Sequence, residues 1–147
     1  MGFINYRYTQ AFAGAALLSG CAALSVGCAV TDTPDTFTAT ITAVGQADRV
    51  DKDAGTCYFG DVPVSGGDLT TLSGSTVALV RSKLVLLSIE RVSETTTECR
   101  YSATFEGVPS QQRDYSVLLV NSEPFGKSLP AQAFTTAQLR SGAVFQL

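Results

Sequence analysis

Alternation of apolar and polar side chains at every second position is the feature that most constrains how this chain can fold. Apolar residues alternate with threonines over Phe37–Val44, and the same period returns over Cys99–Glu106. Successive side chains of a strand point to opposite faces of a sheet, so this period indicates strands with one buried face. The predicted inner face of the second strand consists of Cys99, Tyr101, Ala103 and Phe105.

Other short apolar segments, separated by Gly, Pro, Asn and Asp, indicate further strands. Leu84–Arg91 is the most apolar run and predicts a central strand, whereas the charged, glycine-broken segment Gln46–Gly55 predicts a loop. One helical turn is expected at Thr136–Arg140, stopped by Gly142. The remaining strand candidates are Thr56–Phe59, Val62–Leu72 with a bend at Gly66-Gly67, Thr76–Arg81, Tyr115–Val120, Ala133–Thr136 and Ala143–Leu147.

About seven short strands with turns between them are typical of an all-β fold, an antiparallel β-sandwich. We expect this domain to cover residues 37–147. Tyr115 follows a turn at the start of a strand, the position of a tyrosine corner, in which the hydroxyl bonds a nearby backbone group. Plain core packing or exposure of Tyr115 is the alternative.

Residues 1–20 have the organisation of a secretory signal peptide. The amino terminus and Arg7 supply positive charge, and the short apolar run Ala11–Leu18 is followed by small residues. That run is too short to cross a bilayer, although an interrupted helix over residues 11–30 could just span one. Residues 21–36 end in small and polar side chains and predict a flexible tether.

The motif Leu18-Ser19-Gly20-Cys21 resembles the lipobox of bacterial lipoproteins at all four positions. The resemblance implies that the Cys21 thiol carries a diacylglycerol and that the leader is removed before Cys21. It also implies a lipid anchor in the cell membrane, with the domain on the extracytoplasmic side. Cys28 is a poorer candidate because Ser25 replaces the preferred Leu. An ordinary cleaved signal and an unanchored secreted protein are the alternative.

Residues 101–120 resemble the prealbumin-like sandwiches found as accessory domains of bacterial surface proteins. The resemblance rests on Phe105-x-x-Val108-Pro109 followed by Tyr115-x-Val117. The segment is also similar to small actinobacterial lipoproteins with a cysteine pair around the middle of the domain. Both resemblances imply a sandwich fold, and neither supplies catalytic residues.

Cys57 and Cys99 lie in strand-like sequence and are the natural disulfide pair of an exported chain. The bridge would close a loop of about 43 residues, which the chain-entropy treatment values at roughly 4 kcal/mol. A redox pair or a metal site is disfavoured because the sequence has no CxxC motif. Cys28 is left without a role; a second lipid site or an intermolecular bridge are its alternatives.

Composition excludes several functions. The chain has no His, which removes Ser-His-Asp and Cys-His catalysis and His-ligated metals. Its net charge of −3 offers no basic field for nucleic acid. No Gly-x-Ser-x-Gly motif or phosphate loop occurs. Asp48, Asp51 and Asp53 are spaced like calcium ligands but lack the Gly and Glu of an EF-hand, so we expect a solvated loop there, with a weak calcium site as the alternative. We therefore expect no enzymatic activity, cofactor or metal.

The sequence thus predicts a membrane-anchored envelope lipoprotein that acts as a non-enzymatic binding module for an unidentified protein or envelope partner. Loops at residues 121–130 and 108–114 are the most open candidate contact sites. The alternative is a prophage-type lipoprotein that excludes superinfecting phage. Nothing in the sequence identifies the partner.

Overall fold

The computed structural model describes residues 35–75, 80–122 and 126–147. The predicted leader, the lipobox with Cys21, Cys28 and nearly all of the tether lie outside these residues. Pro34–Leu147 forms one compact unit that is separate from Met1–Thr33. In the described part of the chain, no helix has the length and apolar character needed to cross a membrane.

The predicted all-β sandwich is confirmed. One four-stranded sheet has the order β11 (Ala143–Gln146), β1 (Thr36–Ala47), β8 (Thr97–Pro109), β7 (Val85–Arg91). The other has the order β10 (Gln132–Thr135), β9 (Asp114–Val120), β5 (Leu69–Gly74), β6 (Val80–Lys83). A small third sheet contains β2 (Arg49–Asp51), β3 (Thr56–Phe59) and β4 (Val62–Ser65). Pairing is antiparallel except between β1 and β11, which run parallel.

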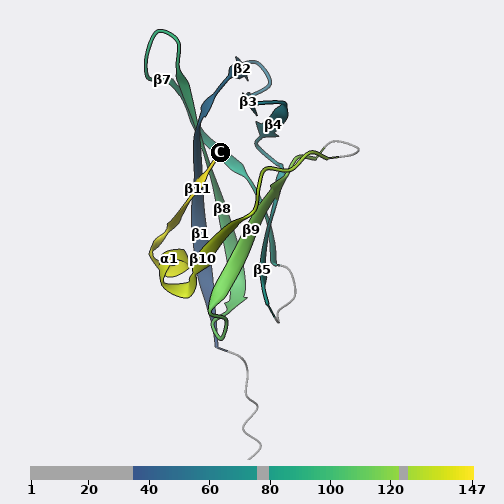
Figure 1. Cartoon of the computed structure of the whole chain (residues 1–147), viewed down its shortest axis with the longest axis vertical. Coiled ribbons are helices and arrows are strands. Elements are labelled where there is room, and N and C mark those ends of the chain that lie inside the picture. The colour runs from purple at the N-terminus through teal and green to yellow at the C-terminus, as the bar shows by residue number, and fades with distance from the viewer. Residues whose placement is uncertain (1–34, 76–79, 123–125) are drawn as a thin grey trace, which may run out of the picture. The chain divides into compact units, whose positions relative to one another are not determined.

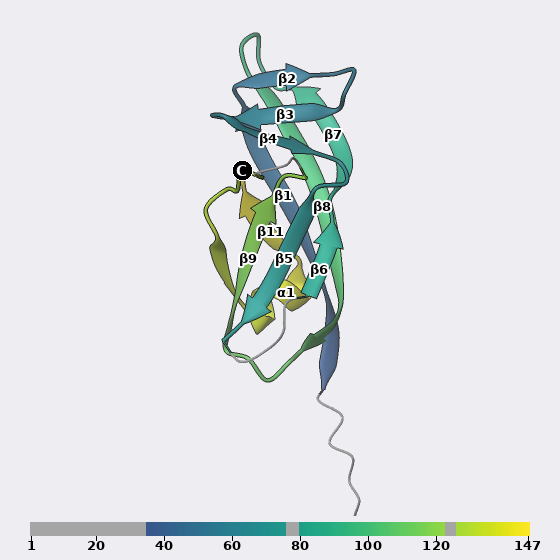
Figure 2. The ribbon, with the colours of Figure 1, turned by 90° about the vertical axis from the view of Figure 1, so that its right-hand side faces the viewer.

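Within this unit, β1 begins near the end that carries α1 (Thr136–Ser141) and runs toward the small sheet (Figure 1). Seen from the side, β2 and β3 lie crosswise over that far end of the sandwich (Figure 2). β9 runs in the same direction, so its last residues also lie near the small sheet. The domain therefore has an entry end, where the chain arrives, and a far end.

The core lies between the two larger sheets and extends under the small one. The alternating residues of β1 and β8 point inward as predicted, and the β9 side chains meet them from the opposite sheet. The largest fully buried side chains include Tyr101, Phe105, Ile41, Tyr115, Leu119 and Phe145.

Leu84–Arg91 does not form a central strand, contrary to the sequence-based prediction. β7 lies at the edge of its sheet, and β1 and β8 occupy the centre. A register shift between Leu86 and Ser88 leaves Leu87 as an extra residue. Leu87 is 55% exposed and Val85 is 58% exposed. The apolar character of this segment therefore predicts a strand, but it does not predict that the strand lies at the centre of the sheet.

The prediction of a loop over residues 46–55 is also wrong in part. β1 continues to Ala47, and β2 pairs with β3. Backbone pairing tolerates charged side chains because β2 exposes them to solvent. Only the bend at Asp48 and the turn from Lys52 to Gly55 are irregular, and Asp51 Oδ1 accepts the backbone N–H groups of Asp53 and Ala54 in that turn.

The predicted helical turn is confirmed as α1. Thr135 caps it by accepting from the backbone N–H of Gln138, whose side chain accepts in return from the Thr135 backbone N–H. The helix ends at Gly142, whose φ of 89° suits glycine.

The tyrosine corner is confirmed as well. The Tyr115 hydroxyl donates to the Pro109 carbonyl. The ring of Phe37 packs edge-on against the Tyr115 ring, with centroids 6.1 Å apart. These contacts fix the turn between β8 and β9 to the first strand.

Cys57 and Cys99 form a disulfide, as expected. Both are fully buried, and they join β3 of the small sheet to β8 of the large one. The Tyr101 hydroxyl donates to the Val64 carbonyl at 2.8 Å, a second link between the same two sheets. The small sheet is therefore held to the sandwich by a covalent bond and a buried hydrogen bond.

Candidate functional site

The two loops expected to contact a partner lie at different ends of the domain. The loop at residues 108–114 belongs to the entry end, where the Ser110 backbone N–H donates to the Asp35 carbonyl at 2.8 Å. The Ser110 hydroxyl also donates to the Asp35 carboxylate at 3.2 Å. This loop is thus tied to the residue immediately before β1. The loop at residues 121–130 follows β9 at the far end.

A polar cleft of about 100 Å³ lies at the far end, between the β3–β4 hairpin and the start of the loop at residues 121–130. The side chains that line it alternate with the buried core residues of that hairpin, so they face away from the disulfide. Its lining residues are Thr56, Tyr58, Pro63, Ser65, Asp68 and Asn121.

Hydroxyl groups and a carboxylate are fixed in place on one side of this cleft. Thr56 and Ser65 are directly opposite in the hairpin, and their hydroxyl oxygens are 2.7 Å apart. The Asp68 side chain accepts from the Ser65 backbone N–H at 2.8 Å and from the Ser122 N–H at 3.0 Å. Asp68 is only 6% exposed, so these two bonds hold a buried carboxylate between the two walls.

Asn121 is the unusual residue of the cleft. It is 5% exposed, and neither Nδ2 nor Oδ1 of its carboxamide has a hydrogen-bond partner in the structure described. Its backbone is well placed, because its N–H donates to the Lys127 carbonyl at 3.0 Å. A Cβ built on Gly126 would lie 2.6 Å from the Asn121 carbonyl oxygen, so Gly126 is what allows the loop to close over Asn121.

The loop and the hairpin are also connected at the surface. Lys127 Nζ lies 2.8 Å from the Asp61 carboxylate and donates to the Asp61 carbonyl at 3.1 Å. The hydrogen bond and the charge of Lys127 lower the pKa of the Asp61 carboxyl. The Asp61 side chain is exposed, so this pair orients the loop and contributes little stability.

The Tyr58 ring, which lines the cleft, packs against a cation. The Arg49 guanidinium lies 3.7 Å from the centroid of the Tyr58 ring, and the two residues are opposite each other in the β2–β3 pairing. Pro63 stands opposite Tyr58 on the next strand. The two rings supply the apolar surface of the cleft.

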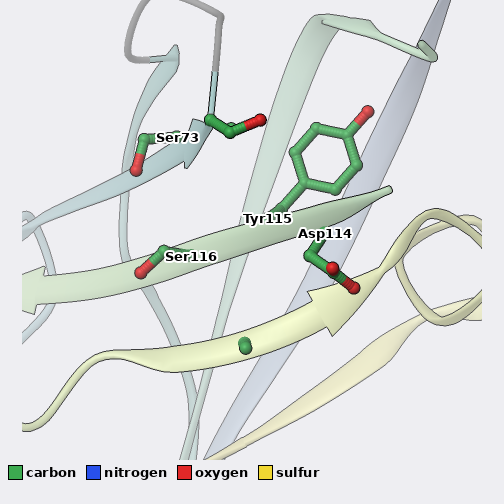
Figure 3. A pocket seen from close by; sticks show the side chains of 7 residues that line it. Ser73, Asp114, Tyr115 and Ser116 are labelled. Carbon is green, nitrogen blue, oxygen red and sulfur yellow. The ribbon is translucent and has the colours of Figure 1, made fainter. Parts of the chain in front are cut away.

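A second hollow, of about 260 Å³, lies toward the entry end and is lined by Ser73, Asp114, Tyr115 and Ser116 among others. In Figure 3 the Tyr115 hydroxyl points away from both serines, and the Asp114 carboxylate lies on another side of β9. The Tyr115 hydroxyl is already bonded to the Pro109 carbonyl. These side chains therefore do not converge on a common point.

The aspartates spaced like calcium ligands do not share a site. The Asp48 carboxylate accepts from the Gly60 N–H at 2.6 Å, whereas Asp51 caps the β2–β3 turn. Within the described ranges, no group of three or more His, Cys, Asp or Glu residues could hold a metal ion. Asp48 and Asp51 thus each accept backbone N–H groups of a turn.

Sequence reasoning identified the loop at residues 121–130 but missed Asp68 and Asn121 as a pair. They are 53 positions apart and belong to no motif; only the β5–β9 pairing brings them together. Of the site residues predicted from the sequence, Cys57 and Cys99 form a disulfide, and the lipobox residues lie outside the described part of the chain.

The cleft is thus the one place in the described residues where a buried polar side chain without a partner borders an open polar space. Comparison of the chain with protein-family models, curated proteins and solved structures finds no match to any of them.

Proposed function

We propose that the protein is a lipid-anchored lipoprotein of the cell envelope whose β-sandwich acts as a non-enzymatic binding module. The anchor would be Cys21, after removal of residues 1–20. The observation that carries export is the Cys57–Cys99 disulfide, because such bonds persist in oxidising compartments outside the cytoplasm. The leader and the motif at residues 18–21 supply the route and the anchor.

The direction of β1 separates the attachment point of the tether from the polar cleft. The tether joins the domain at the start of β1, and the 12 residues of that strand cover roughly 40 Å. The polar cleft therefore lies at the end of the domain that is remote from the point where the tether is attached. The loop at residues 108–114 lies at the attachment end, so the loop at residues 121–130, beside the cleft, is the better candidate for contact with a partner.

Metabolic labelling with a palmitate analogue tests the anchor. The wild-type protein should be labelled and should fractionate with membranes, whereas Cys21→Ser should lose the label. Cys28→Ser is the matched control and should keep it. Label retained by Cys21→Ser and lost by Cys28→Ser would move the anchor to Cys28, and label on neither wild type nor variants would refute lipidation.

No described feature favours phage exclusion over another binding role. That alternative is tested by challenging cells that express the protein with phage and measuring plaque formation. Equal plaque counts with and without the protein would remove it.

A further inference from the structure

We infer that the far-end cleft binds a hydroxyl-rich ligand, a neutral sugar unit, through Asn121, Asp68 and the Thr56–Ser65 hydroxyl pair. This inference deepens the binding function proposed above by naming its site and ligand class. The observation that starts it is the buried, unpartnered carboxamide of Asn121 at the edge of an open polar space.

A buried carboxamide without hydrogen-bond partners needs an explanation. A buried polar group without a partner destabilises the folded state, and such groups are normally satisfied by protein, water or ligand. The terminal torsion of Asn is broad, so the Asn121 carboxamide would rotate to meet a group placed in the cleft. A ligand there would gain a donor and an acceptor that the folded chain leaves unused.

The cleft also provides the other groups that hydroxyls need. The Asp68 carboxylate is an acceptor with capacity left after its two N–H bonds, and the Thr56 and Ser65 hydroxyls can donate or accept. These groups surround the space on the polar side. Tyr58 and Pro63 provide an apolar wall suited to the C–H face of a sugar ring.

Charge narrows the ligand class. The only ionisable lining groups are the Asp68 carboxylate and the Tyr58 phenol, and no lining residue is basic. Lys127 is paired with Asp61, and the Arg49 guanidinium lies over the Tyr58 ring. An anionic ligand would meet Asp68 without compensation, so phosphate and carboxylate ligands are disfavoured.

The size of the cleft sets the mode of binding. A volume of about 100 Å³ is well below the roughly 300–1,000 Å³ of pockets that enclose a small molecule. The cleft would therefore hold one edge of a terminal sugar and two or three of its hydroxyls. We expect a Kd on the order of 1 mM for a monosaccharide, because few atoms are in contact.

The test uses the full-length protein, purified in a detergent without a sugar head group and labelled with ¹⁵N. Glucose, galactose, mannose and N-acetylglucosamine are added separately to 50 mM. At least one should shift the NMR signals of the Asn121 side-chain amide and of the Ser65 and Ser122 backbone amides, which report on Asp68. The Ser73 and Ser116 amides, in the second hollow, should stay unchanged.

Asn121→Leu is the decisive variant, because it keeps the shape and removes only the carboxamide. It should weaken sugar binding at least tenfold without lowering Tm, since the amide has no partner to lose. Ser73→Ala, which removes a hydroxyl from the second hollow, is the matched control and should bind like wild type.

Several results would overturn the inference. No shift with any of the four sugars at 50 mM, or a signal between the Asn121 amide and bound water alone, would make the site a water site. Unchanged binding by Asn121→Leu, or preferential binding of inorganic phosphate or Ca²⁺, would refute the ligand class. The palmitate result is independent of all these outcomes, so failure of the anchor and failure of the cleft can be told apart.

Discussion

The Cys57–Cys99 bond should supply a large part of the stability of this domain. Its loop of about 43 residues corresponds to roughly 4 kcal/mol by loss of chain entropy in the unfolded state. Small domains have a total of only about 5–15 kcal/mol. For a domain of this length, a loss of 1 kcal/mol lowers Tm by about 4 °C. Reduction of the bond should therefore lower Tm by about 16 °C.

Thermal unfolding followed by circular dichroism measures this difference. The oxidised protein is compared with protein reduced during unfolding, because both sulfurs are fully buried and a reductant should not reach them in the folded state. The double variant Cys57→Ala/Cys99→Ala should lose a little more than the reduced protein, since it also removes buried sulfur atoms.

Cys28→Ala controls for replacing a cysteine that is not part of this disulfide, and it should leave Tm unchanged. The reasoning is refuted if the reduced protein unfolds within about 4 °C of the oxidised one. It is also refuted if maleimide labels Cys57 and Cys99 in unfolded but unreduced protein, because both would then be free thiols.

Three further predictions concern packing and ionisation. Tyr115→Phe should lower stability by about 1–2 kcal/mol, seen in urea unfolding, because it leaves the Pro109 carbonyl without its donor; no change would dismiss the tyrosine corner. Gly45→Ala should cost about 1–3 kcal/mol or more, because its Cβ would lie 2.5 Å from the Leu147 Cβ, whereas Gly66→Ala, with nothing nearer than 3.7 Å, should be near neutral; equal effects would contradict this view. Burial raises the pKa of the Tyr101 phenol to about 12, against 10.0 when it is exposed. Since the unfolded chain releases this proton first, stability should be complete below pH 10 and fall between pH 10 and 12, by up to about 1.4 kcal/mol per pH unit. Tyr101→Phe should not show the loss of stability between pH 10 and 12 that ionisation of Tyr101 causes. If the wild type and the variant lose stability identically with pH, Tyr101 does not contribute to the loss.

How far the sequence predicts the fold can be judged from particular strands. β1 and β8 were predictable because every second residue is apolar, and this period fixes which face is buried. β7 was placed wrongly in the sheet because its hydrophobicity says nothing about its neighbours. Position in a sheet depends on long-range pairing, and β7 is an edge strand because β8 pairs with β1 on its other side.

In the candidate site, too, the local sequence predicts some features and long-range pairing decides the others. Residues 121–130 could be identified as an open loop from Asn, Pro and Gly, but no local signal marks Asn121 as buried. Asp68 and Asn121 face one cleft because β5 pairs with β9 and the β3–β4 hairpin folds back over their ends. A sequence that contains thirteen acidic residues offers no way to select Asp68 in advance.

Local rules were enough for the alternating strands, the α1 cap and the tyrosine corner, because each depends on side chains a few residues apart. The disulfide could also be chosen from the sequence, since only one pair of cysteines lies in strand-like segments. Strand order, the edge position of β7 and the polar cleft were decided by tertiary structure, because each arises from contacts between segments tens of residues apart, whose energies no local pattern records.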